Sequence, residues 1–226
     1  MGADFTERLV SLPSFYIPFL FALCFHEYAH GWVAKKKGDN TAELMGRLNM
    51  NPLSHVDWVG TVGLPIMAYL FSIPFLFGWA KPVPVNPRNL RKPKEDMFWI
   101  AFAGPLSNIL LFFVGCGLAF LLNRSGIFSS VVSMDTQIAL NKMLLTFLFI
   151  NMILAVFNLI PLHPLDGGKI LARFLPYEWN RFLEEHAVHG QMILLMLIIT
   201  GIFSILIWPF DLITRIAWFL VGGPLD

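Results

Sequence analysis

The chain has 226 residues and a net charge of +1, and 56% of its residues are hydrophobic while only 14% are charged. A soluble globular domain carries about 25% charged residues, so this composition excludes intrinsic disorder, a coiled coil and an ordinary soluble enzyme. With a net charge near zero, no overall basic field points to nucleic acid. The expected fold class is an all-α polytopic membrane protein with about four to six transmembrane helices.

Four long apolar segments each reach the roughly 20 residues that a helix needs to cross a bilayer. They are expected at about 14–34, 97–122, 139–160 and 188–208, and a short apolar stretch at 213–221 follows Pro209. The stretch 59–79 is also long and apolar enough to span. Its two prolines and three glycines, however, argue against a continuous helix.

Basic residues gather in three loops: after 14–34, before 97–122 and after 139–160. Basic loops are expected on the cytoplasmic side of a membrane. If 59–79 crossed completely, the two basic loops that flank it would lie on opposite sides. The charge pattern therefore predicts that 59–79 is a re-entrant segment, which enters the membrane and returns on the same side.

The first apolar segment contains the sequence HEYAH, with His26, Glu27 and His30. Residues four apart share one face of a helix, so both imidazoles can reach one metal ion. Glu27 is suited to activate a water molecule on that metal. A chance match is the alternative. Since each ionisable group inside a transmembrane helix costs about 2.5–3.5 kcal/mol, such groups are functional candidates.

A catalytic zinc site usually takes three protein ligands. The candidates for the third are His55, His163, Asp166, His186 and His189. Asp166 fits best, because Pro161 and Pro164 break the preceding helix and two following glycines allow the backbone to turn. The alternative is that Asp166 caps a helix at 168–174. His55 and His163 are interpreted as loop residues, with His55 solvated.

The two sequences HEYAH and FNLIPLHPLDGG, in this order and both in membrane segments, resemble the site-2 protease family of intramembrane zinc metalloproteases (peptidase family M50). The resemblance runs from about residue 15 to 175 and includes AGPLSN at 103–108. It implies zinc ligands at His26, His30 and Asp166, and Glu27 as general base and acid. It also suggests Asn158 as a polar helper near the substrate carbonyl or the metal; a purely structural interhelical hydrogen bond is the alternative.

The proposed metal also constrains the topology. One ion can meet all three ligands only if 14–34 and 139–160 run in the same direction, which again requires that 59–79 does not cross. The resemblance adds a re-entrant hairpin after the first helix, whose edge could hold substrate as an added strand. The stretch 44–50 is the candidate for that edge, with an ordinary loop as the alternative.

The expectation is therefore a single membrane-embedded metalloprotease domain at 1–226, with core motifs at 15–175 and C-terminal helices at 188–221. The cofactor is Zn²⁺, and the partners are transmembrane protein substrates and the lipid bilayer, without nucleic acid. The expected location is the cell membrane, multi-pass, with the active site toward the cytoplasm. The competing hypotheses are a membrane transporter or metal-binding protein that uses the same His/Asp cluster without proteolysis, and a non-catalytic relative of a protease.

Overall fold

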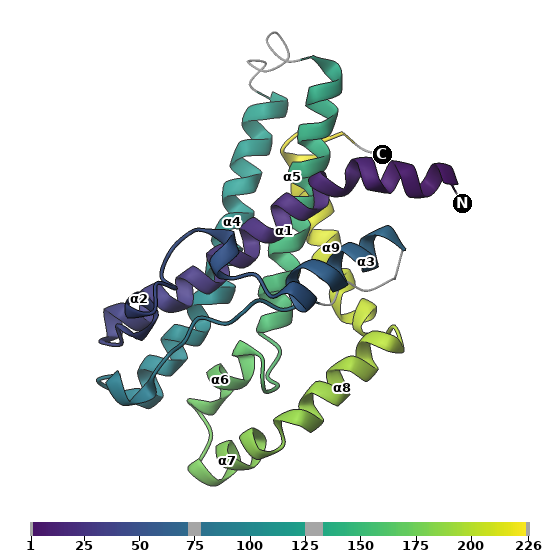
Figure 1. The fold of residues 1–226 in the computed structure, drawn as a ribbon. Helices are drawn as coiled ribbons and strands as arrows, with labels where there is room; N and C mark the ends of the chain where they lie inside the picture. Colours follow the sequence, from purple (N-terminus) through teal and green to yellow (C-terminus); the bar gives the residue numbers. More distant parts are fainter. Residues whose placement is uncertain (1, 72–77, 125–132, 225–226) are drawn as a thin grey trace.

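A computed structural model describes residues 2–71, 78–124 and 133–224, and within these ranges every regular element is helical (Figure 1). Four helices are long and apolar enough to cross a membrane: α1 (Gly2–Lys37), α4 (Pro93–Arg124), α5 (Met134–Asn158) and α9 (Ile202–Leu220). The pair α7 (Tyr177–Glu185) and α8 (Ala187–Ile199), bent by 63°, would make a fifth span. The predicted fold class is confirmed.

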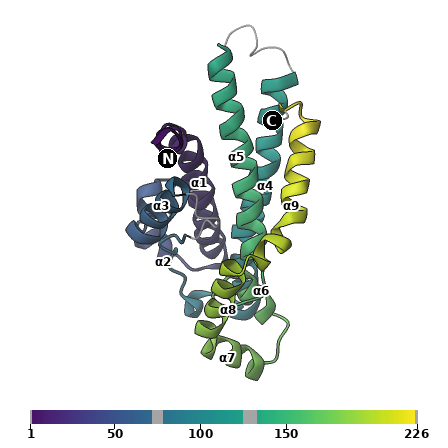
Figure 2. The same ribbon diagram turned by 90° about the vertical axis from the view of Figure 1, so that its right-hand side faces the viewer.

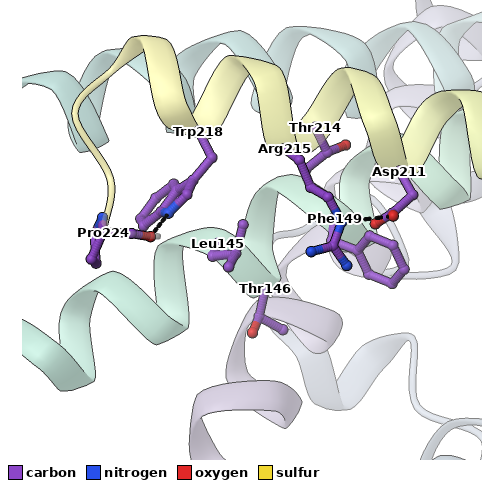
Figure 3. Close-up of a pocket in the computed structure, with 8 residues that line it drawn as sticks. All are labelled: Leu145, Thr146, Phe149, Asp211, Thr214, Arg215, Trp218 and Pro224. Carbon is purple, nitrogen blue, oxygen red and sulfur yellow. Dashed lines mark hydrogen bonds and ion pairs between the residues drawn. The ribbon is translucent and has the colours of Figure 1, made fainter. Parts of the chain in front are cut away.

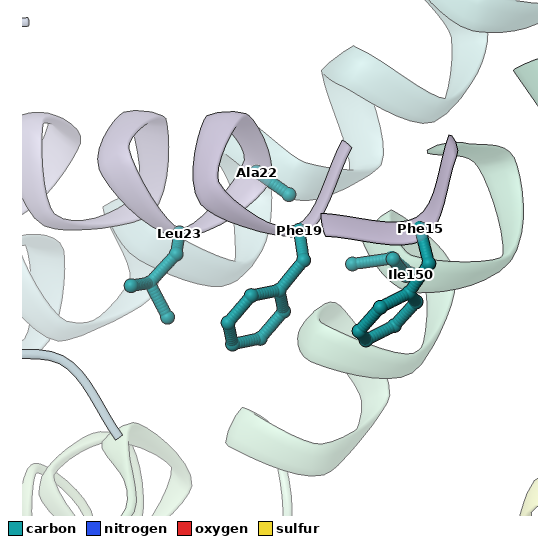
Figure 4. Packing of buried hydrophobic residues seen from close by; sticks show 5 residues of the cluster. All are labelled: Phe15, Phe19, Ala22, Leu23 and Ile150. Atoms are coloured by element: carbon teal, nitrogen blue, oxygen red, sulfur yellow. The ribbon is translucent and has the colours of Figure 1, made fainter. Parts of the chain in front are cut away.

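The three helices α1, α4 and α5 pack together and form the centre of the molecule. Phe15, Phe19 and Leu23 of α1 lie with Ile150 of α5 in a buried apolar cluster (Figure 4). The second view shows α4, α5 and α9 standing beside one another, with α1 and the short α3 (Leu64–Leu70) to one side (Figure 2).

The end of α1, the start of α4 and the end of α6 (Asp166–Ala172) meet at one end of the molecule. Lys37 Nζ lies 3.0 Å from Asp96 Oδ1, and Lys94 Nζ donates to the carbonyl of Leu175 at 2.9 Å. The ends of the helices suit these positions: basic residues fill the last turn of α1, and acidic residues fill the first turn of α4. The three basic loops therefore lie at the same end of the molecule, as the charge pattern predicts.

The predicted re-entrant segment is a short helical piece followed by a return. A π-helical turn (Trp58–Gly63) continues into α3, and residues 72–77 lie outside the described residues. The N–H of Trp79 donates to Gly60 O at 3.2 Å, so the two ends of the segment lie side by side. A Cβ on Gly60 would collide with the Trp79 ring, so this close approach requires glycine. This geometry agrees with a segment that enters and returns.

Two predictions of local structure are wrong. The stretch 44–50 is not a strand edge: α2 (Thr41–Leu44) runs into a turn with Gly46 at φ +66°. The C-terminal break also lies elsewhere than at Pro209. Gly201, at φ +77°, ends α8, and Pro209 lies inside α9. A left-handed glycine is a common helix terminator, whereas a proline inside a membrane helix is tolerated.

Candidate metal centre

Three side chains that are far apart in the sequence converge in the centre of the fold. The Nε2 atoms of His26 and His30 each lie 3.1 Å from the same oxygen, Asp166 Oδ2. One ligand-type atom from each residue lies within 4.8 Å of the others. The three residues are only 6%, 9% and 6% exposed. Among the described residues, no other group of histidines, cysteines and carboxylates converges closely enough to hold a metal ion.

Each side chain reaches the centre for a local reason. His26 and His30 are one helical turn apart on α1, and their rings meet edge to face at 4.6 Å. Asp166 is the first residue of α6, after the turn that follows α5. A Cβ on Gly167 would collide with the carbonyls of Leu159 and Ile160, so this turn folds tightly against the end of α5. The residue that caps α6 is Leu165, so the capping alternative for Asp166 does not hold.

The other nitrogen of each imidazole is taken by a neighbour. His26 Nδ1 lies 2.7 Å from Asn108 Oδ1, and His30 Nδ1 donates to the carbonyl of Ile100 at 2.6 Å. Acceptors at both Nδ1 atoms fix the tautomer and the ring orientation, as is typical of metal-binding histidines. The Nε2 atoms are therefore the ones that face Asp166 and the centre.

A buried amide network holds these rings in place. The side-chain amide of Asn108 donates to Ala22 O at 3.2 Å and to Asn151 Oδ1 at 3.0 Å, and Asn151 in turn donates to Phe147 O at 2.8 Å. Both asparagines are fully buried. The network links α1, α4 and α5, and sequence reasoning assigned it no role. The sequence does contain these two uncharged polar residues within apolar helices, and such residues commonly form hydrogen bonds between helices.

Gly104 of α4 completes the wall of the centre. A Cβ at this position would lie inside contact distance of both His26 and His30. The absence of a side chain is therefore what lets α4 approach the two imidazoles so closely. The sequence AGPLSN at 103–108 contains both Gly104 and Asn108.

The carboxyl of Asp166 is held in its charged form. Burial by itself would raise its pKa, but His30 and His26 outweigh this effect and hold the pKa well below its usual range. Lys169 adds a weaker contact, with Nζ 3.6 Å from Oδ1. A carboxylate binds a metal ion in this ionised form.

Glu27 and Asn158, the other two predicted site residues, each make one hydrogen bond through the side chain. Glu27 is partly buried on α1, and its Oε2 accepts a hydrogen bond from the N–H of Val83 at 2.9 Å. Asn158 is the last residue of α5, and its amide donates to the carbonyl of Leu154 at 3.0 Å. That bond lies within one helix, so it differs from the interhelical bond that was the structural alternative.

The remaining histidines lie outside the cluster. The prediction that His55 is solvated is wrong: it is 1% exposed, and its Nε2 lies 2.9 Å from Asn49 O. The returning chain also pairs with the backbone of His55, through Lys81 N–H to His55 O at 2.9 Å. His163 lies in the turn before α6, where burial and Lys169 lower its pKa against the opposing effect of Glu184.

A hollow of about 340 Å³ lies between α5 and α9, away from the cluster (Figure 3). It contains an ion pair within α9, with Arg215 Nε 2.8 Å from Asp211 Oδ2. Its remaining lining residues are mostly apolar and include none of the predicted site residues.

Fold and site together define a helical membrane protein with a buried His/His/Asp centre. The model of peptidase family M50 matches residues 14–200, and the chain belongs to this family. "Putative zinc metalloprotease YwhC" of Bacillus subtilis is 33% identical over 198 residues, which cover 88% of this chain and 85% of that protein. "Putative zinc metalloprotease Rip2" of Mycolicibacterium smegmatis is 28% identical over 216 residues, covering 91% and 76%. No solved structure matches the chain.

Proposed function

We propose that this chain is an intramembrane zinc metalloendopeptidase that hydrolyses peptide bonds in the transmembrane segments of other proteins. Membership of family M50 supports the peptidase class. The observation that carries the assignment of the site is the shared oxygen: both imidazole Nε2 atoms lie 3.1 Å from Asp166 Oδ2, inside a bundle of apolar helices.

The donor set fits zinc. Two imidazole nitrogens and one carboxylate are three ligands of the kinds that zinc takes in catalytic sites, where a fourth position stays open. The Nδ1 atoms of His26 and His30 are already occupied, so their Nε2 atoms and Asp166 would hold the ion. A zinc ion bound there supplies a Lewis acid that lowers the pKa of a water molecule to about 7 and polarises a carbonyl.

Glu27 is proposed as the general base and acid. It lies next to His26 in the sequence, on the same helix as both imidazoles, and it is partly buried. Its carboxylate would take the proton from the attacking water and pass it to the leaving amine. Asn158 is proposed as a polar group near the substrate carbonyl. Its place at the end of α5, directly before the turn to Asp166, supports this role.

The substrate must be held partly unwound, because the backbone of a transmembrane helix is otherwise fully hydrogen-bonded. The centre lies toward the end of α1 that carries Lys35, Lys36 and Lys37. Because basic flanks favour the cytoplasmic side, we place the active site toward the cytoplasm of a cell membrane. We treat residues 1–226 as one metalloprotease domain, with core motifs at 15–175 and C-terminal helices at 188–221.

The test is Glu27→Gln in the protein reconstituted with a tagged single-span membrane protein as substrate. The variant should keep its zinc and lose cleavage by at least about 100-fold, the scale of a general base. Glu43→Gln is the matched control, because Glu43 is exposed and pairs only with Lys35 in the described contacts. Unchanged cleavage by Glu27→Gln would contradict the assignment, and zinc movement without any cleavage would favour the transporter hypothesis.

A further inference from the structure

Residues 78–86, with the sequence GWAKPVPVN, form a strap without helix or strand that contacts α1 at Glu27. Hydrogen bonds hold the strap on both sides of its centre. Lys81 N–H donates to His55 O at 2.9 Å, and Asn86 N–H donates to Asp39 Oδ2 at 2.7 Å. The guanidinium of Arg47 also donates to the carbonyl of Lys81 at 2.7 Å. These contacts fix the path of the strap over α1.

The middle of the strap touches Glu27. Val83 lies between Pro82 and Pro84, which have no N–H, so Val83 supplies the one backbone donor of this tripeptide. That donor is directed at Glu27 Oε2, at 2.9 Å. The Val83 side chain is buried, and a Cβ on Gly31 would lie 3.0 Å from its Cγ1. Gly31 is one helical turn after Glu27, so it leaves the room in which Val83 approaches α1.

We propose that the backbone N–H of Val83 is a positioning group for Glu27, and that the strap exists in part to present it. This inference rests on the proposed function. The bond occupies one oxygen of the carboxylate and restrains the rotation of the group, which leaves the other oxygen to act as the base. The flanking prolines restrict the strap to extended backbone, and the bonds of Lys81 and Asn86 hold it in register.

The direct test is Val83→Pro, which removes the N–H, compared with Val83→Ala, which keeps it. Val83→Pro should lower kcat by about 10- to 100-fold, as expected for loss of a hydrogen bond to a charged group. KM, zinc stoichiometry and the absorption spectrum of the Co²⁺-substituted protein should stay unchanged. Val83→Ala should lower kcat by less than about threefold. Equal losses in the two variants, or a kcat of Val83→Pro near that of the wild type, would overturn the proposal.

A second pair of variants decides the matter if Val83→Pro does not fold. Gly31→Ala pushes the strap away from α1 and keeps every backbone donor, so kcat should fall while the zinc content is kept. Because a Cβ on Gly31 would also lie 3.1 Å from Leu48 Cδ1, combining Gly31→Ala with Val83→Ala and Leu48→Ala restores the room and should recover most of kcat; failure to recover would contradict the proposal. Gly117→Ala is the control, because a Cβ there meets no atom within 4 Å. If Glu27→Gln loses cleavage but these variants have no effect, this inference is refuted and the proposed function still stands.

Discussion

Two groups of ionisable side chains among the apolar helices are built differently. In the metal centre, His26, His30 and Asp166 come from α1 and α6, and their side chains are only 8%, 11% and 7% exposed. In α9, Asp211 and Arg215 pair within a single helix, with side chains 27% and 73% exposed. The first group depends on the whole fold, whereas the second needs only helical spacing.

The two groups differ in how strongly neighbouring residues fix the positions of their side chains. Every nitrogen of the two imidazoles in the metal centre has a partner, and these partners come from α4 and from Asp166. Burying such groups without partners would be costly, and pairing them across several helices fixes one arrangement. The pair in α9 imposes no comparable constraint. If this contrast in construction reflects a contrast in function, changes in the metal centre should affect zinc binding and cleavage far more than changes in α9.

The largest effect is expected at Gly104. In Gly104→Ala the new methyl group would push against both imidazoles, so zinc affinity and cleavage should both fall by more than about 100-fold, a larger loss than that from a single outer contact. The measurements are zinc content after dialysis and the rate of substrate cleavage. Gly117→Ala, on the same helix but without neighbours within 4 Å, should retain both. Normal zinc binding by Gly104→Ala would show that the centre is less tightly packed than described.

Removal of the partner of His26 should have the next largest effect. Asn108→Ala leaves Nδ1 of His26 without its acceptor and also breaks the bond to Asn151. Loss of such an outer contact typically costs 10- to 100-fold in metal affinity. Competition with a zinc chelator measures this directly. Asn123→Ala, near the far end of α4, is the matched substitution and should leave the affinity as it is; equal affinities in the two variants would argue against the network.

A smaller effect on stability is expected at Asp39, a fully buried carboxylate that binds the strap instead of a metal. Burial would raise its pKa, but hydrogen bonds from Thr41, Asn89 and Asn86 outweigh burial and lower it. A lowered pKa stabilises the fold above the pKa of the unfolded chain, about 3.9, and this stabilisation is lost as the pH falls through the folded value.

Asp39→Asn should therefore lower the free energy of unfolding by about 1–3 kcal/mol at neutral pH, the cost of disturbing a buried charged hydrogen-bond network. Its deficit relative to the wild type should shrink as the pH approaches 3, because the wild type loses the same stabilisation. Thermal unfolding in detergent between pH 3 and pH 7 measures both. A deficit that is independent of pH would contradict the role given to the charge.

The smallest effect is expected in α9. The double variant Asp211→Asn/Arg215→Gln removes both charges together, so no unpaired charge remains. Exposed pairs of this kind contribute about 1 kcal/mol or less, and neither residue touches the metal centre. Zinc content and cleavage should therefore match the wild type. A loss of zinc in this variant would show that the α9 pair also supports the metal centre, against the contrast drawn between the two groups.

The sequence predicts those parts of the molecule that depend on local spacing. The spacing of His26 and His30 follows from helical periodicity, and the prolines and glycines around Asp166 indicate its turn. Asn108, Ile100 and Val83 could not be assigned in this way, because their roles depend on the register between α1, α4 and the strap. The break at Gly201 is also beyond the sequence, because it depends on a left-handed backbone conformation that no apolar pattern reveals.

The central claim is that His26, His30 and Asp166 hold one zinc ion. The most direct measurement is elemental analysis of the purified protein and of Asp166→Ala, with Asp135→Ala as a control, because Asp135 is exposed at the start of α5. We predict about one zinc ion per chain in the wild type and the control, as for a catalytic site with three protein ligands, and almost none in Asp166→Ala. Equal zinc content in all three proteins would contradict the account.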